Sequence, residues 1–187
     1  LEVMEVAQTL QNMGPEDLRE ISLELAARMI FLGKVAGTLE EARLRAEELL
    51  IDKSGYRKFK EVIQAQGGDP SVLDRFELLP NATAVQEITC PRDGYISMIA
   101  AEDIGRASQM IGAGRDRKED PIDHAVGVIL ECKVGTKVDA GSVLCRIYYT
   151  ETTDPQRLEE AAELVEGAFK ISQQPPDVRN IILETVG

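Results

Sequence analysis

The spacing of the apolar residues changes near Val85, and this change limits the folds open to the chain. Before it, apolar residues recur every three to four positions, as on the buried side of a helix. After it, short apolar runs are broken by Gly and Pro, as in strands joined by turns. The sequence therefore predicts an α+β protein, with a helical segment over residues 1–80 and a β-rich module with a C-terminal helix over residues 81–187.

Four helices and one shorter turn are predicted before the change. Apolar spacing is already helical at Val3, and Gly14-Pro15 separates a first helix from a second, which Gly33 would end. The apolar stripe of the second helix comprises Leu18, Ile21, Leu25, Met29 and Leu32. The remaining start signals are a capping box at Thr38 and Glu41, an N-cap at Ser54 and an Asp69-Pro70 pair.

The second half is predicted to contain short strands and two helices. Gly135 and Gly141 would adopt positive φ at two tight turns of a small twisted barrel. The predicted strands cover 87–90, 95–99, 125–130, 143–149 and 181–183. The predicted helices cover 101–111 and a segment that begins at Asp154-Pro155, includes Leu158, Ala162, Val165 and Phe169, and ends before Pro175-Pro176.

Charge and composition exclude several classes of function. The 33 acidic residues exceed the 21 basic ones, for a net charge of −12, which argues against binding to nucleic acid or to anionic membranes. No apolar run approaches the roughly 20 residues of a transmembrane helix. Three cysteines without a C-x-x-C pair predict free thiols in a reducing compartment. A single histidine, His124, nearly rules out a His-rich metal cage or a Ser-His-Asp triad.

The segment 112–124 holds the most distinctive polar residues. Gly112-Ala-Gly-Arg115 lacks the Lys-Ser/Thr of a P-loop, so it is interpreted as a structural turn or, through Arg115 and the neighbouring Arg117 and Lys118, as an anion contact. Asp120 and Asp123 would form Asx turns or pair with those arginines. His124 is adjacent to Asp123 and would point to the opposite side of an extended chain, so no Asp-His dyad is expected.

Val134 and the spacing G-x-x-V-x-x-G-x-x-L-x-x-I over 135–147 match the strand-and-turn spacing of biotinyl and lipoyl carrier domains, whose shape is the barrel-sandwich. Carriers display one modified lysine, commonly within Met-Lys-Met. That triplet is absent here, although Lys133 and Lys137 flank the first turn. A non-enzymatic carrier or protein-interaction module is therefore the alternative function.

Several motifs, in order, resemble the C-terminal part of the pyrimidine-nucleoside and thymidine phosphorylases. They are Leu1-Glu-Val-x-Glu5, Gln64-Ala-Gln-Gly-Gly68, Asp93-Gly-Tyr-Ile96, Asp103-Ile-Gly105, Gly112-Ala-Gly-Arg115, Asp120-Pro-Ile-Asp123 and Ala125-Val-Gly127. The resemblance implies a cytoplasmic, homodimeric enzyme of nucleoside salvage without an organic cofactor. It would convert thymidine, uridine or deoxyuridine and phosphate to free base and (deoxy)ribose 1-phosphate.

The resemblance also implies that residues 1–80 complete a larger α/β domain that begins upstream. The chain opens at Leu1 without a methionine, and its phosphate-binding and base-binding residues would precede this point. We therefore expect this chain alone to be inactive, with no catalytic residue of its own and Arg115 as a candidate substrate contact. Family members that bind potassium use a glutamate that aligns with Glu5. The alternative for Glu5 is an exposed helical residue.

Overall fold

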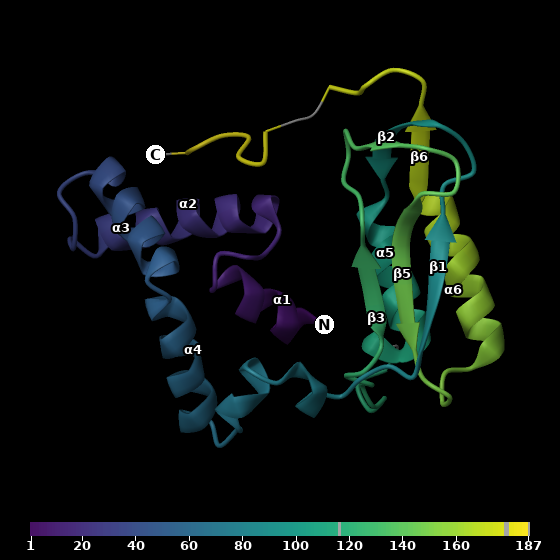
Figure 1. Ribbon diagram of the computed structural model, residues 1–187, viewed down its shortest axis with the longest axis horizontal. Helices are drawn as coiled ribbons and strands as arrows, with labels where there is room; N and C mark the ends of the chain where they lie inside the picture. Colours follow the sequence, from purple (N-terminus) through teal and green to yellow (C-terminus); the bar gives the residue numbers. More distant parts are fainter. Residues whose placement is uncertain (116, 178–179, 187) are drawn as a thin grey trace. The chain divides into compact units, whose positions relative to one another are not determined.

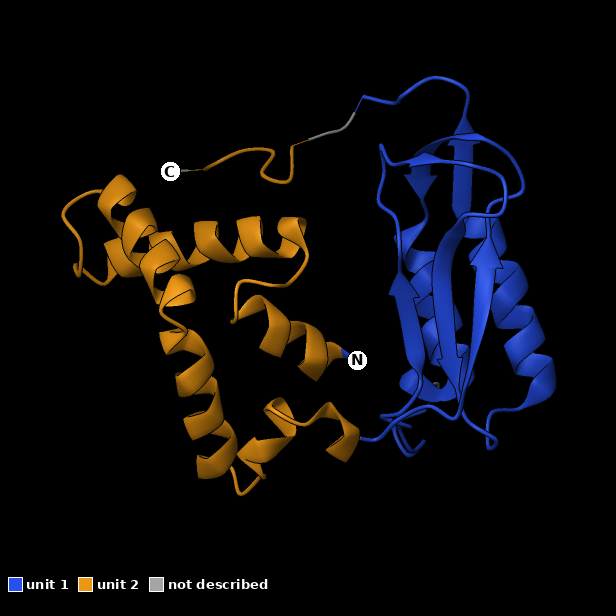
Figure 2. Cartoon of the chain, in the orientation of Figure 1, with its two compact units in different colours: residues 1, 80–179 blue, residues 2–79, 180–187 orange. Residues whose placement is uncertain are grey.

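The computed structural model describes residues 1–115, 117–177 and 180–186. The chain divides into two compact units (Figure 2). The helical unit comprises Glu2–Leu79 and Asn180–Gly187, and the β unit comprises Leu1 and Pro80–Arg179. Within the described residues, each helix is too short or too polar to cross a lipid bilayer.

The helical unit contains four α-helices and two short 3₁₀ turns (Figure 1). Thr38 and Glu41 form the predicted capping box, and Asp69 accepts a hydrogen bond from the Ser71 amide as the predicted N-cap. The N-cap prediction for Ser54 is wrong. Lys53 holds that position, and the Asp52 carboxylate accepts from the Ser54 amide at 2.7 Å. The elements are α1 (Glu2–Thr9), α2 (Glu16–Leu32), α3 (Leu39–Ile51), α4 (Ser54–Ala65), η1 (Pro70–Leu73) and η2 (Phe76–Leu78).

Helices α2 and α3 pack through small side chains. Leu23 and Ala27 of α2 and Ala42 and Ala46 of α3 are all buried, and the two helices lie against each other. Arg43 of α3 pairs with Glu20 of α2 at 2.6 Å across this seam. The predicted stripe of α2 lies on another side of the helix and is largely exposed. A second small core, built on Ala7, Tyr56 and Leu73, joins α1, α4 and η1.

The β unit contains two antiparallel three-stranded sheets, in the orders β1-β5-β3 and β4-β2-β6, with α5 and α6 packed side by side (Figure 1). Gly135 and Gly141 have φ of 93° and 86°, as predicted. The elements are β1 (Ala84–Thr89), β2 (Gly94–Ile99), α5 (Ala101–Ser108), the π-helical turn η3 (Gln109–Ala113), β3 (Gly127–Leu130), β4 (Lys137–Val138), β5 (Val143–Tyr149), α6 (Pro155–Ala168) and β6 (Phe169–Ser172).

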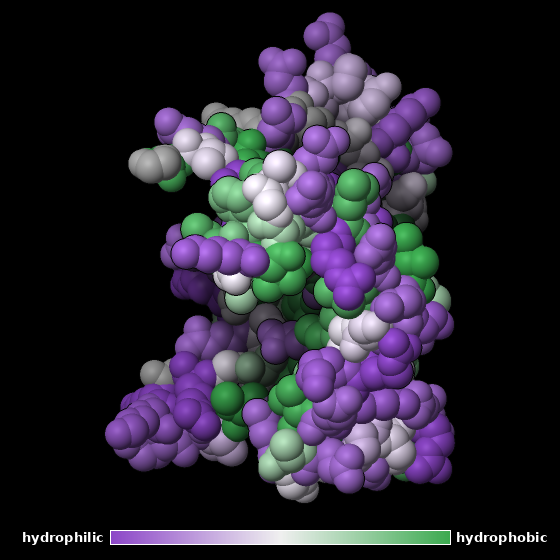
Figure 3. All heavy atoms as spheres, turned by 90° about the vertical axis from the view of Figure 1, so that its left-hand side faces the viewer, coloured by the Kyte–Doolittle hydropathy of each residue, from purple (hydrophilic) through white to green (hydrophobic). Residues whose placement is uncertain are grey.

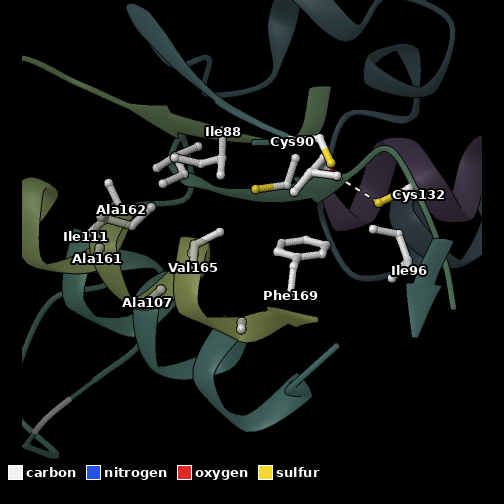
Figure 4. Packing of buried hydrophobic residues seen from close by; sticks show 14 of the residues in the cluster. Ile88, Cys90, Ile96, Ala107, Ile111, Cys132, Ala161, Ala162, Val165 and Phe169 are labelled. Atoms are coloured by element: carbon white, nitrogen blue, oxygen red, sulfur yellow. Dashed lines mark hydrogen bonds between the residues drawn. The ribbon is translucent and has the colours of Figure 1, made fainter. Parts of the chain in front are cut away.

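One apolar core holds the β unit together. Side chains of both sheets and of the two helices share one cluster, which includes Ile88 of β1, Ile96 of β2, Ala107 of α5 and Val165 of α6 (Figure 4). Burial of these apolar groups is the main stabilising term of such a unit. The mixed helix and sheet content confirms the α+β class. The described strands form open sheets rather than the closed small barrel suggested by the turn spacing.

Three predictions for the second half of the chain differ from the structure. The last helix ends at Ala168, and the chain continues directly into β6, which pairs with β2. The helix predicted over 101–111 changes from α-helical to π-helical geometry at Gln109. Ile181–Leu183, predicted as a strand, has no strand structure.

Candidate functional site

The loop that follows α5 begins at a kink. Helix α5 passes into the π-helical turn η3, where Gly112 has φ 109° and ψ 0°. Residues that carry a Cβ rarely adopt this backbone conformation, so Gly112 permits the chain to leave the helix here. Single π-helical turns are frequent at functional sites. The amide of the Gln109 side chain then donates to the carbonyl of Arg115 at 2.5 Å and orders the next residues.

Asp123 closes the base of this loop. Its backbone amide donates to the Gly112 carbonyl at 3.0 Å, so residues 112 and 123 are joined directly. Its carboxylate accepts from the Ala125 amide at 2.9 Å and from the Thr150 hydroxyl at 3.2 Å. Thr150 directly follows β5, and its hydroxyl lies 2.8 Å from that of Thr152. Asp123 thus ties the base of the loop to the turn that precedes β3 and to the residue that follows β5.

The carboxylate of Asp120 also serves the backbone. It accepts from the Arg117 amide at 2.7 Å, while the Asp120 amide donates to the Arg117 carbonyl. The Asx-turn alternative is confirmed for Asp123, which accepts from the amide two residues ahead, whereas Asp120 accepts from an amide three residues before it and forms a different local contact. Such bonds to local amides fix a loop conformation without a regular ladder.

The cationic side chains on this loop are exposed. Arg115 has its carbonyl fixed by Gln109 but its side chain is accessible, as are Arg117 and Lys118. A guanidinium in this state presents five donors to solvent and to an arriving anion. The segment therefore has a base joined at Gly112 and Asp123, and residues 115–120 beyond that base carry three basic and three acidic side chains.

Comparison with known proteins identifies the family. Residues 95–172 match the pyrimidine nucleoside phosphorylase C-terminal domain. The chain is 38% identical over 186 residues to the pyrimidine-nucleoside phosphorylase of Geobacillus stearothermophilus, a match that covers 100% of this chain and 42% of the relative. The chain belongs to the pyrimidine-nucleoside phosphorylase family.

Other relatives give the same result. The Bacillus subtilis enzyme of this name is 44% identical over 148 residues, covering 79% of this chain and 34% of the relative. The Staphylococcus aureus (strain MSSA476) enzyme is 38% identical over 187 residues, covering 98% of this chain and 42% of the relative. The chain thus spans about two fifths of the length of these pyrimidine-nucleoside phosphorylases and matches their C-terminal portion.

Glu5, the predicted potassium ligand, lies on the exposed side of α1. Its backbone carbonyl accepts a hydrogen bond from the Thr9 hydroxyl at 2.8 Å. A carboxylate oxygen suits a hard monovalent cation, so the residue fits one position of such a ligand set. In the described ranges, no three His, Cys, Asp or Glu residues come together in an arrangement that could hold a metal.

The three cysteines of this phosphorylase-family chain are core residues, and its histidine is a surface residue. Cys90, Cys132 and Cys145 are free and buried in the core of the β unit. Burial raises the pKa of the Cys132 thiol to about 11 and that of Cys145 to about 12, so both are neutral at physiological pH. A nucleophile requires the thiolate, so the prediction of core cysteines is confirmed. His124 is exposed, whereas Asp123 accepts hydrogen bonds from Ala125 and Thr150.

The turn between Lys133 and Thr136, which a carrier domain would use to display a modified lysine, is also well defined. The Lys133 amide donates to the Thr136 hydroxyl at 3.0 Å, and the Lys133 carbonyl accepts from the Thr136 amide. Lys133 and Lys137 are both exposed beside this turn. The family match is to phosphorylases and gives the carrier reading no support.

Sequence reasoning missed Thr150 and Gln109. The partner of Asp123 lies 27 residues away on another element, so no local spacing connects the two. A run of polar residues directly after a predicted strand, Thr150-Glu-Thr-Thr-Asp154, was the available signal. Gln109 was assigned to a continuous helix, which hid the change of geometry there.

Proposed function

We propose that this chain is the C-terminal part of an enzyme that carries out reversible phosphorolysis of pyrimidine nucleosides. The observation that carries the proposal is the match of the whole chain to enzymes named pyrimidine-nucleoside phosphorylase at 38% identity. In this reaction a phosphate oxygen attacks the anomeric carbon of the sugar, and the bond between that carbon and the pyrimidine nitrogen breaks. The products are the free base and a (deoxy)ribose 1-phosphate.

The chemistry requires fixed cationic and hydrogen-bonding groups more than a covalent catalyst. The transition state resembles an oxocarbenium ion, so phosphate must be held against the sugar while charge develops on the departing base. Thymidine, uridine and deoxyuridine are the proposed substrates. In this chain Arg115 is the proposed anion contact, because its guanidinium is exposed on a loop whose base is fixed by Gly112 and Asp123.

The remaining parts of the proposal concern the parent enzyme. It would be a cytoplasmic homodimer of nucleoside salvage, with residues 1–80 belonging to a larger α/β domain and 81–187 forming a barrel-sandwich module. Glu5 would supply one oxygen ligand to a structural potassium ion. The negative charge of the Glu5 carboxylate would balance the charge of the ion. The 187 residues alone would be inactive, because they correspond to 42% of a relative's length.

The experiment is an assay of the full-length parent with thymidine, uridine and deoxyuridine, each with and without phosphate. Free base is separated by chromatography and measured by ultraviolet absorbance. We expect base release that depends on phosphate and none from the 187-residue chain. Absence of release by the parent, or equal release without phosphate, would overturn the proposed reaction. Robust turnover by the 187-residue chain would overturn its proposed inactivity.

Arg115→Ala in the parent tests the loop. We expect the KM for phosphate or nucleoside to rise by about 10- to 150-fold, because one charge-assisted contact contributes on the order of 1.5–3 kcal/mol. Lys58→Ala, on exposed α4, is the matched control and should leave both constants unchanged. Unchanged constants for Arg115→Ala would remove this residue from the binding site.

A further inference from the structure

The backbone of Arg115 is held by a side chain of the preceding turn. Hydrophilic residues cover much of the face seen in Figure 3, so exposure alone does not mark a charged residue as a ligand contact. The side-chain amide of Gln109 donates to the Arg115 carbonyl at 2.5 Å. Gln109 is half-buried in the π-helical turn η3, six residues before Arg115. One side chain of this turn therefore fixes the backbone from which the guanidinium extends.

Gly114 leaves room for this contact. A Cβ atom added at Gly114 would lie 3.1 Å from Cγ and 3.3 Å from Cβ of Gln109. Both distances are below the roughly 3.5–4.0 Å that two nonbonded carbon atoms prefer. The backbone of Gly114 is extended, with φ −135° and ψ −179°, so space rather than conformational freedom favours glycine here. The Gln109 side chain thus lies along Gly114 and reaches the carbonyl of the next residue.

Two hydrogen bonds therefore fix the start of the loop. Gly112 is joined to Asp123 at 3.0 Å, and Arg115 is joined to Gln109. A side chain binds a ligand more tightly when the backbone that carries it is already ordered, because less conformational entropy is lost on binding. We propose that Gln109 is a positioning residue, which holds the Arg115 backbone so that the guanidinium meets the phosphate substrate without an ordering step. This inference rests on the proposed function, which makes Arg115 the anion contact.

The first test compares KM and kcat of variants of the full-length parent with uridine and phosphate. Gln109→Met keeps the length of the side chain and removes its donor. Gln173→Met is the matched control, because Gln173 also donates its side-chain amide to a backbone carbonyl, that of Asp93 at 3.5 Å, outside the loop. We expect Gln109→Met to raise the same KM as Arg115→Ala does, by about two- to tenfold, and to leave kcat unchanged. The control should leave both constants unchanged.

A double substitution separates positioning from general stability. In Arg115→Ala there is no guanidinium to position, so adding Gln109→Met should raise KM by less than about twofold. A loss of stability would instead reduce the active fraction, and hence kcat, in both backgrounds. An unchanged KM for Gln109→Met beside a raised KM for Arg115→Ala would overturn the inference, as would fully additive effects.

Trypsin digestion of the 187-residue chain gives a readout that needs no enzymatic activity. Trypsin attacks the Arg115 carbonyl, and this backbone must leave its held conformation before it can enter the protease. Cleavage after Arg115, followed by mass spectrometry, should be at least about threefold faster in Gln109→Met than in the wild-type chain or in Gln173→Met. Equal rates would overturn the hold on which the inference rests. Gln109→Ala is the second variant, for use if Gln109→Met prevents folding, and it carries the same expectations.

The two readouts separate this inference from the proposed function. An active parent in which Gln109→Met changes neither KM nor the rate of cleavage overturns only this inference. An unchanged KM for Arg115→Ala removes Arg115 from the binding site, and Gln109 with it. A parent without phosphate-dependent base release overturns the proposed reaction and this inference together, even if Gln109→Met accelerates cleavage.

Discussion

At the scale of single residues, Asp123 has the largest effect on the candidate site. Its amide and carboxylate join Gly112, Ala125 and Thr150, which belong to three separate segments. The sequence predicted the Asx-turn part of this arrangement, because an aspartate bonds readily to an amide two residues ahead. It could not predict Thr150, since that contact exists only once β5 has been placed beside the loop.

Thr150→Val tests this attachment. Loss of a hydrogen bond to a carboxylate should lower the free energy of unfolding by about 1–2 kcal/mol. Thr89→Val, at an exposed position of β1, is the matched control and should change it by less than about 0.5 kcal/mol. Urea denaturation of the 187-residue chain measures both. Equal effects of the two substitutions would show that the Thr150 contact adds nothing to stability.

The buried thiols give a second residue-scale prediction. Burial raises the pKa of Cys145 to about 12 and that of Cys132 to about 11, from an ordinary value of 9.0. The unfolded chain therefore loses these protons first, and their contribution is complete below pH 9 and declines as pH rises toward 11 and 12. The urea concentration at the unfolding midpoint should therefore decrease as the pH is raised above about 9.

Cys145→Ala isolates the effect of one thiol. The variant is expected to be less stable at neutral pH because a buried sulfur is lost, but its stability should fall less steeply from neutral pH to about 10.5. The comparison is between the slopes of the free energy of unfolding against pH for the wild-type chain and for the variant. Parallel slopes for wild type and variant would contradict the raised pKa of Cys145.

At the scale of elements, local signals predicted most helix starts and central strands, and failed where tertiary contacts decide. Strand β6 was missed because Phe169 continues the apolar stripe of α6 and no Gly or Pro separates the two elements. Its strand structure comes from pairing with β2, more than 70 residues earlier in the chain. Such non-local pairing overrides a local helical pattern.

Two of the predicted caps, one found and one not, form a matched pair of substitutions. Thr38→Ala removes half of the capping box of α3 and should cost about 1 kcal/mol of unfolding free energy. Ser54→Ala removes a hydroxyl that accepts from Arg57 and hydrogen-bonds the Asp52 carboxylate, both at exposed positions, so it should cost less than about 0.5 kcal/mol. Thermal unfolding of the 187-residue chain compares them, and an equal or reversed order would contradict the cap assignment.

At the scale of the whole molecule, the change of apolar period predicted a helical half and a β-rich half. The apolar period of α2 correctly predicted a helix, but not the side by which it packs: α3 lies against Leu23 and Ala27, and the predicted stripe is largely exposed. The Gly112 loop of the candidate site belongs to this chain, while most phosphate and base contacts are proposed to lie elsewhere in the parent.

The most direct test of the central claim observes the bond that phosphorolysis forms. The full-length parent is incubated with uridine and phosphate, and the mixture is followed by phosphorus-31 NMR. The account predicts that the inorganic phosphate signal decreases as a ribose 1-phosphate signal grows in step with free uracil. Release of uracil with an unchanged phosphate signal, or no reaction at all, would contradict it.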